Sequence, residues 1–168
     1  MSDTIKIGSK IIEGGTAYEV FKIEKSKKGN GDTTLVYYRP YFNISNNSDI
    51  VCSIPEHNIS PPEMRKPSSK IEIEEVFVYL SKKSNGNIEV DIMKSKDILR
   101  QNSLTQTAEV LKEVFREKKS KGEEFSKSKK DLLEASISKM VEEIALVYRV
   151  SLATAEKKIS SALDKPFN

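Results

Sequence analysis

The chain has one histidine, one cysteine and no tryptophan among its 168 residues. A single cysteine, Cys52, cannot form an internal disulfide, so the sequence gives no sign of an oxidising compartment. Pro55 separates Cys52 from His57, and no third residue at nucleophile or zinc-ligand spacing accompanies them. These scarcities argue against a metal centre and against cysteine–histidine catalysis.

Phosphate loops and catalytic carboxylates are also scarce. The glycines of GGT and GNG lack the Lys-Ser/Thr ending of a phosphate-binding loop, so they are predicted to form turns. The carboxylate pairs Glu123–Glu124 and Glu142–Glu143 are predicted to lie on exposed helix positions beside lysines. The sequence therefore favours a protein that is not an enzyme and that holds no cofactor or metal.

Long apolar runs are missing as well. No window approaches the roughly 18 apolar residues of a membrane span, so no contact with a membrane is expected. The opening residues MSDTIKIGSK lack the apolar stretch of a signal peptide. We therefore predict a cytoplasmic location.

What is present falls into two halves with different periods. Over residues 1–60, segments rich in Ile, Val, Tyr and Phe alternate with Gly/Asn turns, which is the signature of strands and hairpins. The segments are IKIGSKII, AYEVFKIE, TLVYYRPYF and DIVCSI. This pattern predicts a small antiparallel β-barrel or half-barrel.

The second half has a helical period. Three prolines within SPPEMRKPSS exclude a helix or a central strand, so residues 61–70 are predicted to form a linker. IEIEEVFVYL (71–80) is predicted to be a helix, whereas IEVDIM (88–93) alternates as a strand does. The predicted fold class is α+β, a small β-barrel followed by a compact helical domain over residues 71–168.

Serine caps divide the rest of the helical half. Ser103 opens the capping-box pattern SLTQ, and Gly122 ends the helix that follows. Ser126 and Ser151 are suited to cap the next two helices. The helix after Ser126 has an apolar inner stripe of Leu132, Leu133, Ile137, Met140, Val141, Ile144 and Val147.

The net charge of +3 is too small to indicate nucleic-acid binding, but its distribution is uneven. Residues 1–80 carry ten Lys/Arg and eleven Asp/Glu, whereas residues 81–168 carry eighteen and fourteen. The stretch FREKKSKGEEFSKSKKD (115–131) alone holds seven basic and four acidic residues. It is either a solvated loop between two helices or a surface that binds a polyanion.

The ordered segments resemble the CarD/CdnL family of bacterial transcription regulators. IKIGSKIIEGGTAYEVFKIEK is similar to the family's opening strand, glycine turn and second strand, and SIPEHN is similar to the end of its β domain. IEIEEVFVYL is similar to the family's first helix. TAEVLKEVFREKKSKGEEFSKSKKDLLEASISKMVEEIALV resembles its long helical pair in spacing and apolar pattern. The likeness extends over nearly the whole chain.

The resemblance implies a Tudor-like domain (1–60) that binds the RNA polymerase β subunit, and a helical domain that contacts double-stranded promoter DNA without sequence preference. Such a protein, expected to be a monomer, stabilises the open promoter complex. The implied polymerase-binding residues are Lys25, Lys27, Lys28, Arg39 and Ser53. The implied DNA-binding residues are Ile88, Lys94, Lys96, Arg116, Lys118, Lys119, Lys127, Lys129 and Lys130.

The chain departs from the family pattern at both sites. The family's minor-groove wedge is typically a tryptophan, and Ile88 stands in its place, followed by Val90 and Asp91 where a basic pair is usual. Ser53 stands where a basic residue usually precedes the Ile-Pro pair. Two alternatives therefore stay open: a protein–protein adaptor on RNA polymerase without DNA contact, and an RNA-associated SH3-like binding protein. The sequence indicates neither which promoters respond nor whether the effect is activation or repression.

Overall fold

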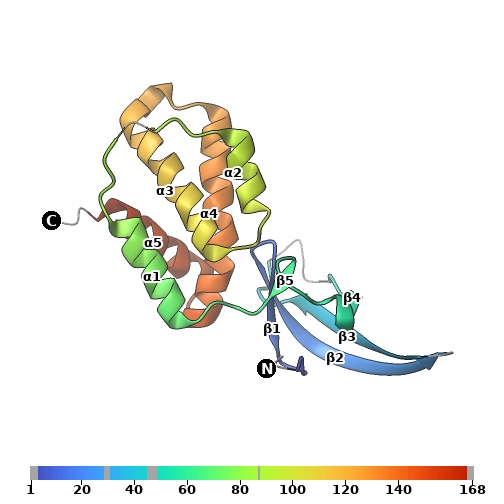
Figure 1. The fold of residues 1–168 in the computed structure, drawn as a ribbon. Coiled ribbons are helices and arrows are strands. Elements are labelled where there is room, and N and C mark those ends of the chain that lie inside the picture. Colours follow the sequence, from blue (N-terminus) through green and yellow to red (C-terminus); the bar gives the residue numbers. More distant parts are fainter. Residues whose placement is uncertain (1–3, 29–30, 45–48, 87, 166–168) are drawn as a thin grey trace.

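The computed structural model describes residues 4–28, 31–44, 49–86 and 88–165, and among them it has an α+β fold in which a curled sheet lies beside a helical bundle (Figure 1). The α-helices are α1 (Lys70–Ser81), α2 (Ile92–Leu99), α3 (Leu104–Lys121), α4 (Lys127–Tyr148) and α5 (Leu152–Asp164), and the short 3-10 turns are Glu56–Asn58 and Gly122–Glu124. The strands are β1 (Lys10–Glu13), β2 (Thr16–Lys28), β3 (Gly31–Pro40), β4 (Cys52–Pro55) and β5 (Met64–Arg65).

The five strands form one antiparallel sheet in the order β4-β3-β2-β1-β5, curled into a half-barrel. A β-bulge between Val20 and Lys22 interrupts the pairing of β2 with β3, and such bulges increase the local bend and twist. The concave face encloses a small core of Ile11, Val20, Val36, Tyr38 and Met64. β2 and β3 continue beyond their other neighbours as a two-stranded ribbon, because β4 pairs only as far as Leu35.

The segment predicted to be a linker (61–70) takes part in both halves. Met64 is buried in the sheet core, and Arg65 pairs with Ile12 as β5 adds an edge strand beside β1. Proline is tolerated next to an edge strand because such a strand has a free side, so the three prolines do not prevent this pairing. The chain then passes directly into α1, whose N-cap is Ser69.

The helical half is organised by the predicted caps. The hydroxyls of Ser103, Ser126 and Ser151 each accept a hydrogen bond from the backbone N–H three residues later, which confirms these three helix starts. Gly122 ends α3 with a φ of 56°, and α1 confirms the helix predicted over 71–80. The strand-like prediction for 88–93 is wrong, because Asp91 accepts a hydrogen bond from the Lys94 N–H and starts α2.

The bundle has the larger core, formed by nineteen buried apolar residues from all five helices and the segments between them. Within the described residues, no helix is long and apolar enough to cross a membrane. From the predicted stripe of α4, the side chains of Leu132, Leu133, Met140 and Ile144 are buried, while those of Ile137, Val141 and Val147 are half-buried against the same core.

A buried polar network joins the sheet to the bundle. Arg65 donates two hydrogen bonds of 2.7 Å to the carboxylate of Glu143, whose side chain is fully buried, and the Ser68 N–H donates to the same carboxylate at 2.7 Å. Glu142 accepts the Ala17 N–H at 2.8 Å. The prediction that Glu142 and Glu143 are exposed is therefore wrong, since both face the sheet, whereas Glu123 and Glu124 are exposed as predicted.

Asn102 is the second anchor of this interface. It has a φ of 51° and is 7% exposed, and its amide nitrogen lies within 3.0 Å of the carbonyl oxygens of Ile12, Pro62 and Glu63. Its backbone carbonyl oxygen accepts from the Arg65 Nε–H. Asn102 therefore ties β1 and the segment before β5 to the loop between α2 and α3.

The turn between β1 and β2 touches α4 directly. A Cβ atom on Gly15 would lie 2.7 Å from the Cα of Lys139, and Gly15 has a φ of +92°. The ammonium of Lys139 donates to the Gly14 carbonyl oxygen at 2.9 Å. Only glycine combines this positive φ with so close a backbone approach, so the GGT turn brings the sheet onto the bundle.

Candidate nucleic-acid interface

The candidate DNA-binding residues gather at the end of the bundle farthest from the sheet. The last turns of α3, the 3-10 turn after it, the start of α4 and the start of α2 meet there (Figure 1). Ser126 positions the start of α4 by capping it, and Gly122 reverses the chain at the end of α3. These two signals place the charged stretch 115–131 around one tight helix–helix turn.

Glu117 is the organising group of this end. Its side chain is fully buried, and its carboxylate accepts the Val90 N–H at 2.8 Å, the Lys121 ammonium at 2.8 Å and the Lys129 ammonium. Burial alone raises the pKa of this carboxyl, but the hydrogen bonds from Lys121, Lys129 and the Val90 N–H outweigh it and lower the pKa to about 2. Glu117 therefore stays ionised and fixes the loop before α2 against α3 and α4.

This arrangement removes Lys129 from the group of freely available cations. Its side chain is only 11% exposed and its ammonium is bound to Glu117. Lys129 was one of the candidates for phosphate contact, and the structure gives it a partner within the protein instead. The sequence contains this signal only indirectly, because Glu117 and Lys129 lie on different helices.

Arg116 and Lys119 also have internal partners. Arg116 donates to the Gly86 carbonyl oxygen at 2.9 Å, which holds the segment that follows α1 against α3. The ammonium of Lys119 lies 3.3 Å from the Asp164 carboxylate and 4.7 Å from the centre of the Phe115 ring. Both ends of this ion pair are more than half exposed, so it is weak and can exchange for a phosphate.

The remaining candidate lysines carry no ion pair within the described ranges. Lys118 lies in the last turns of α3, and Lys127 and Lys130 lie in the first turn of α4. Lys94 and Lys96 lie on α2. Ammonium groups with no bound carboxylate are the groups that neutralise phosphates most readily, because no internal pair has to be broken first.

Ile88 is half-buried and packs against the core of the bundle. Its neighbour Val90 is 4% exposed, and Asn87 lies outside the described residues. Ile88 therefore already has protein contacts in this structure. Insertion of its side chain between bases requires those contacts to be given up.

A basic cavity that sequence reasoning missed lies on the side of the bundle where α1, α3 and α5 meet. Its volume is about 410 Å³, and Arg116 and Lys119 are the two sequence-predicted candidates that reach it. The other cations of this cavity are Lys82, Lys83, Lys112 and Lys165. The detectable signal was the spacing of Lys112, Arg116 and Lys119 at i, i+4 and i+7, which places all three on one face of a helix.

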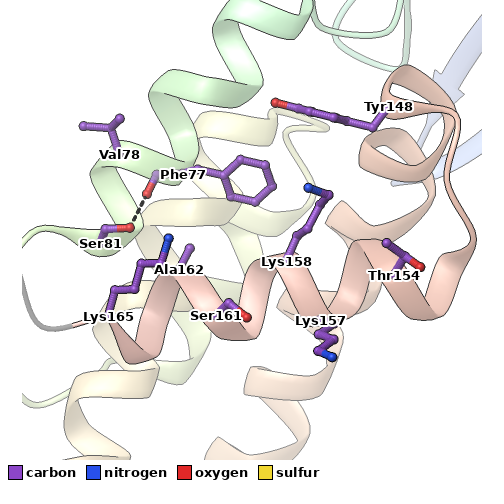
Figure 2. A pocket seen from close by; sticks show the side chains of 10 residues that line it. All are labelled: Phe77, Val78, Ser81, Tyr148, Thr154, Lys157, Lys158, Ser161, Ala162 and Lys165. Atoms are coloured by element: carbon purple, nitrogen blue, oxygen red, sulfur yellow. Dashed lines mark hydrogen bonds between the residues drawn. The ribbon is translucent and has the colours of Figure 1, made fainter.

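An adjoining groove of about 570 Å³ runs between α1 and α5 and shares Ser81 and Lys165 with the basic cavity (Figure 2). Phe77 forms its apolar wall, and Lys158 extends from α5 toward Tyr148, whereas Lys157 points away (Figure 2). The Lys158 ammonium lies 5.3 Å from the centre of the Tyr148 ring. Basic side chains therefore continue from the cavity along this groove.

The candidate polymerase-binding residues lie on the sheet. Lys25, Lys27, Arg39 and Ser53 belong to β2, β3 and β4, while the side chain of Lys28 lies outside the described residues. The guanidinium of Arg39 covers the Phe21 ring, with 5.1 Å between them. The rings of Phe21 and Tyr37 lie 6.5 Å apart.

The same surface carries a second charged group on an aromatic ring. The ammonium of Lys22 lies 5.0 Å from the centre of the Tyr37 ring and 2.5 Å from the Glu24 carboxylate, and the Tyr37 hydroxyl donates to Glu24 at 2.8 Å. Aromatic residues and arginine are enriched in protein–protein contact sites. We call the residues Phe21, Lys22, Tyr37 and Arg39 the ribbon cluster.

In the described part of the chain, no group of three or more His, Cys, Asp or Glu side chains could hold a metal ion. His57 is exposed in the turn after β4. Searches against protein-family models and against curated proteins find no match to this chain.

Proposed function

We propose that the chain is a non-enzymatic transcription regulator of the CarD/CdnL type. In this proposal a Tudor-like sheet binds the β subunit of RNA polymerase, and the far end of the bundle contacts promoter DNA through phosphates. The contact stabilises the open complex without reading a base sequence. The supporting observation is that the end of α3, with Lys118, and the start of α4, with Lys127 and Lys130, lie at the bundle end opposite the sheet.

The sheet has two features suited to a protein partner. The edges of the sheet are β4 and β5, and the edge of a sheet is where a partner strand can be added. Beyond Leu35, β2 and β3 project from the sheet as a ribbon that carries Lys25 and Lys27, and the ribbon cluster lies next to it, where β4 pairs with β3. Polymerase binding through this half is the proposed role of Lys25, Lys27 and Arg39.

The hydrogen-bond network between the halves supports a coupling of the polymerase contact to the DNA contact. Arg65, Glu143 and Asn102 join the sheet to the bundle by buried hydrogen bonds, so a bound polymerase fixes the direction in which the lysine-bearing end points. A fixed orientation raises the effective concentration of the lysines near the DNA. Phosphate contacts that are weak on their own can then be enough to hold the protein on the promoter.

A second candidate function is an adaptor on RNA polymerase that does not contact DNA. Two observations favour it: Ile88 packs against the bundle core, and Glu117 binds both Lys121 and Lys129. Each of these contacts reduces the contribution that the bundle end can make to DNA binding. An RNA-associated binding protein with an SH3-like sheet stays a third alternative.

Two experiments on the full-length chain separate these functions. The chain is expected to co-purify with RNA polymerase, and the Phe21→Ala/Arg39→Ala variant is expected to lose this association. Fluorescence anisotropy with a short duplex is expected to show binding at low salt that weakens as the salt concentration rises. Polymerase association without duplex binding favours the adaptor, and preference for RNA over the duplex favours the third alternative. Absence of polymerase association contradicts the proposal.

A further inference from the structure

The cationic side chains that line the basic cavity between α1, α3 and α5 outnumber the acidic ones. Its lining contains a single carboxylate, Asp164, which is already paired with Lys119. Six cationic side chains share the lining with that carboxylate: Lys82, Lys83, Lys112, Arg116, Lys119 and Lys165. The cavity therefore holds an excess of positive charge that the described residues lining it do not neutralise.

Lys112 is the decisive member of this group. It is 5% exposed, and its ammonium donates to the Tyr79 carbonyl oxygen at 2.5 Å and lies 4.3 Å from the centre of the Tyr79 ring. No carboxylate of the described residues forms an ion pair with it. Burial lowers the pKa of Lys112, and the neighbouring charges of Arg116 and Lys82 lower it further.

The contacts around Lys112 only partly offset the cost of its charge. The Tyr79 carbonyl lies in the last turn of α1, where the helix dipole favours a cation, and the ring face adds a cation–π attraction. These are partial charges, whereas Arg116 and Lys82 repel with full ones. A buried cation surrounded by like charges is stabilised when an anion enters, because the anion interacts favourably with all of them at once.

We propose that this cavity binds a small, multiply charged phosphate anion of the inorganic polyphosphate or nucleoside polyphosphate class. The volume of about 410 Å³ lies within the range of small-molecule sites. Lysine ammonium groups bind phosphate oxygens as point charges, and Arg116 adds planar donors that match two oxygens. A short free polyphosphate can enter a concave site, whereas a duplex presents its phosphates on a convex surface.

This site does not include the three lysines that support the proposed DNA surface. Lys118, Lys127 and Lys130 do not line the cavity, whereas Arg116 and Lys119, also predicted to bind DNA, do line it. The inference therefore does not depend on DNA binding, and only changes to the cavity residues test it. The adjoining α1–α5 groove shares Lys165 with the cavity and offers space for the rest of a larger ligand (Figure 2).

The test is a calorimetric titration of the full-length chain with sodium tripolyphosphate at low salt. Two variants remove cavity charges: Lys82→Gln/Lys83→Gln, which changes only exposed side chains, and Lys112→Met, which keeps the length of the buried side chain. The matched control is Lys127→Gln/Lys130→Gln, which removes two charges outside the cavity. Each cavity variant is expected to raise the dissociation constant by about tenfold, and the control by less than about threefold.

Three results overturn the proposal. One is the absence of tripolyphosphate binding to the unmodified chain at low salt. Another is a loss in the Lys127→Gln/Lys130→Gln control as large as that in the cavity variants, which indicates diffuse attraction by the whole surface. The third is unchanged tripolyphosphate binding in the cavity variants, and a loss of duplex binding in the same variants would then assign the cavity to a nucleic acid. If Lys112→Met does not fold, the Lys82→Gln/Lys83→Gln pair alone decides the outcome.

Discussion

The two halves of this molecule are stabilised in different ways. The bundle encloses nineteen buried apolar residues, whereas the core of the sheet contains five. Two further apolar residues of the sheet, Ile12 and Ala17, are fully buried outside that small core. We infer from this comparison that the sheet gains much of its stability from contacts with the bundle, among them the buried hydrogen bonds between Arg65 and Glu143.

The largest expected effect comes from breaking the buried ion pair between the halves. Arg65→Ala leaves the Glu143 carboxylate buried without its cation, which is expected to cost about 4 kcal/mol of unfolding free energy. The matched control is Arg100→Ala, since Arg100 pairs with Asp97 at a site where both side chains are more than half exposed. That change is expected to cost less than about 0.5 kcal/mol. Equal losses in denaturant unfolding contradict the proposed dependence of the sheet on the bundle.

The next effect concerns the close approach of the β1–β2 turn to α4. Gly15→Ala introduces a Cβ into the Lys139 backbone at a positive φ, and is expected to cost about 3 kcal/mol. Gly14→Ala is the control, because its φ is +57° and a Cβ added there would meet no atom within 4 Å. It is expected to cost about 1 kcal/mol. Thermal unfolding of the two variants measures the difference, and similar melting temperatures would show that the contact is unimportant.

The third effect is a pH-dependent contribution of Glu117, at the bundle end, to the free energy of unfolding. The pKa of Glu117 is about 2 in the folded protein, below its ordinary value of 4.5, so folding favours the ionised form. This contribution is fully present above pH 4.5 and is lost as the pH falls toward 2. Glu117→Gln is expected to lose about 2 kcal/mol near neutral pH, and to differ less and less from the unmodified chain as the pH falls. A constant difference across that range would contradict the assignment.

The smallest effect has the opposite sign and lies at the interface between the halves. Burial raises the pKa of Glu142, although the hydrogen bond from the Ala17 N–H partly opposes this. Folding therefore favours the protonated form, and ionisation of Glu142 reduces stability as the pH rises through its unfolded and then its folded pKa. Glu142→Gln keeps an acceptor oxygen, so unfolding free energy near neutral pH is expected to be unchanged or higher by less than about 1 kcal/mol. A large loss would show that the charge itself is required.

Local signals predicted much of the fold. Ser103, Ser126 and Ser151 start helices because a hydroxyl before an apolar-periodic segment satisfies free N–H groups within its own turn. The same local rule was overlooked at Asp91, where short alternation suggested a strand but the carboxylate caps α2. Periodicity over six residues is too short to decide between a strand and the start of a helix.

Long-range contacts were not predictable from the sequence. Arg65 lies in the predicted linker and Glu143 is one of the acids predicted to be exposed, and only the folded chain brings them together with Asn102. The same holds for the candidate site, where Lys129 was predicted to face a partner and instead binds Glu117. For Lys112, the sequence shows the four-residue spacing to Arg116 that places both on one helix face. It does not show that this face lines a cavity.

The most direct test of the proposed division between the two halves is the salt dependence of duplex binding by the full-length chain. The logarithm of the binding constant falls linearly with the logarithm of the salt concentration, with a slope of about −0.9 for each phosphate that is neutralised. Replacement of Lys118, Lys127 and Lys130 by glutamine is expected to make the slope shallower by about 2 to 3, with polymerase association unchanged. A slope that is the same in the unmodified chain and the triple variant, measured between about 50 and 200 mM salt, would contradict the proposed DNA surface.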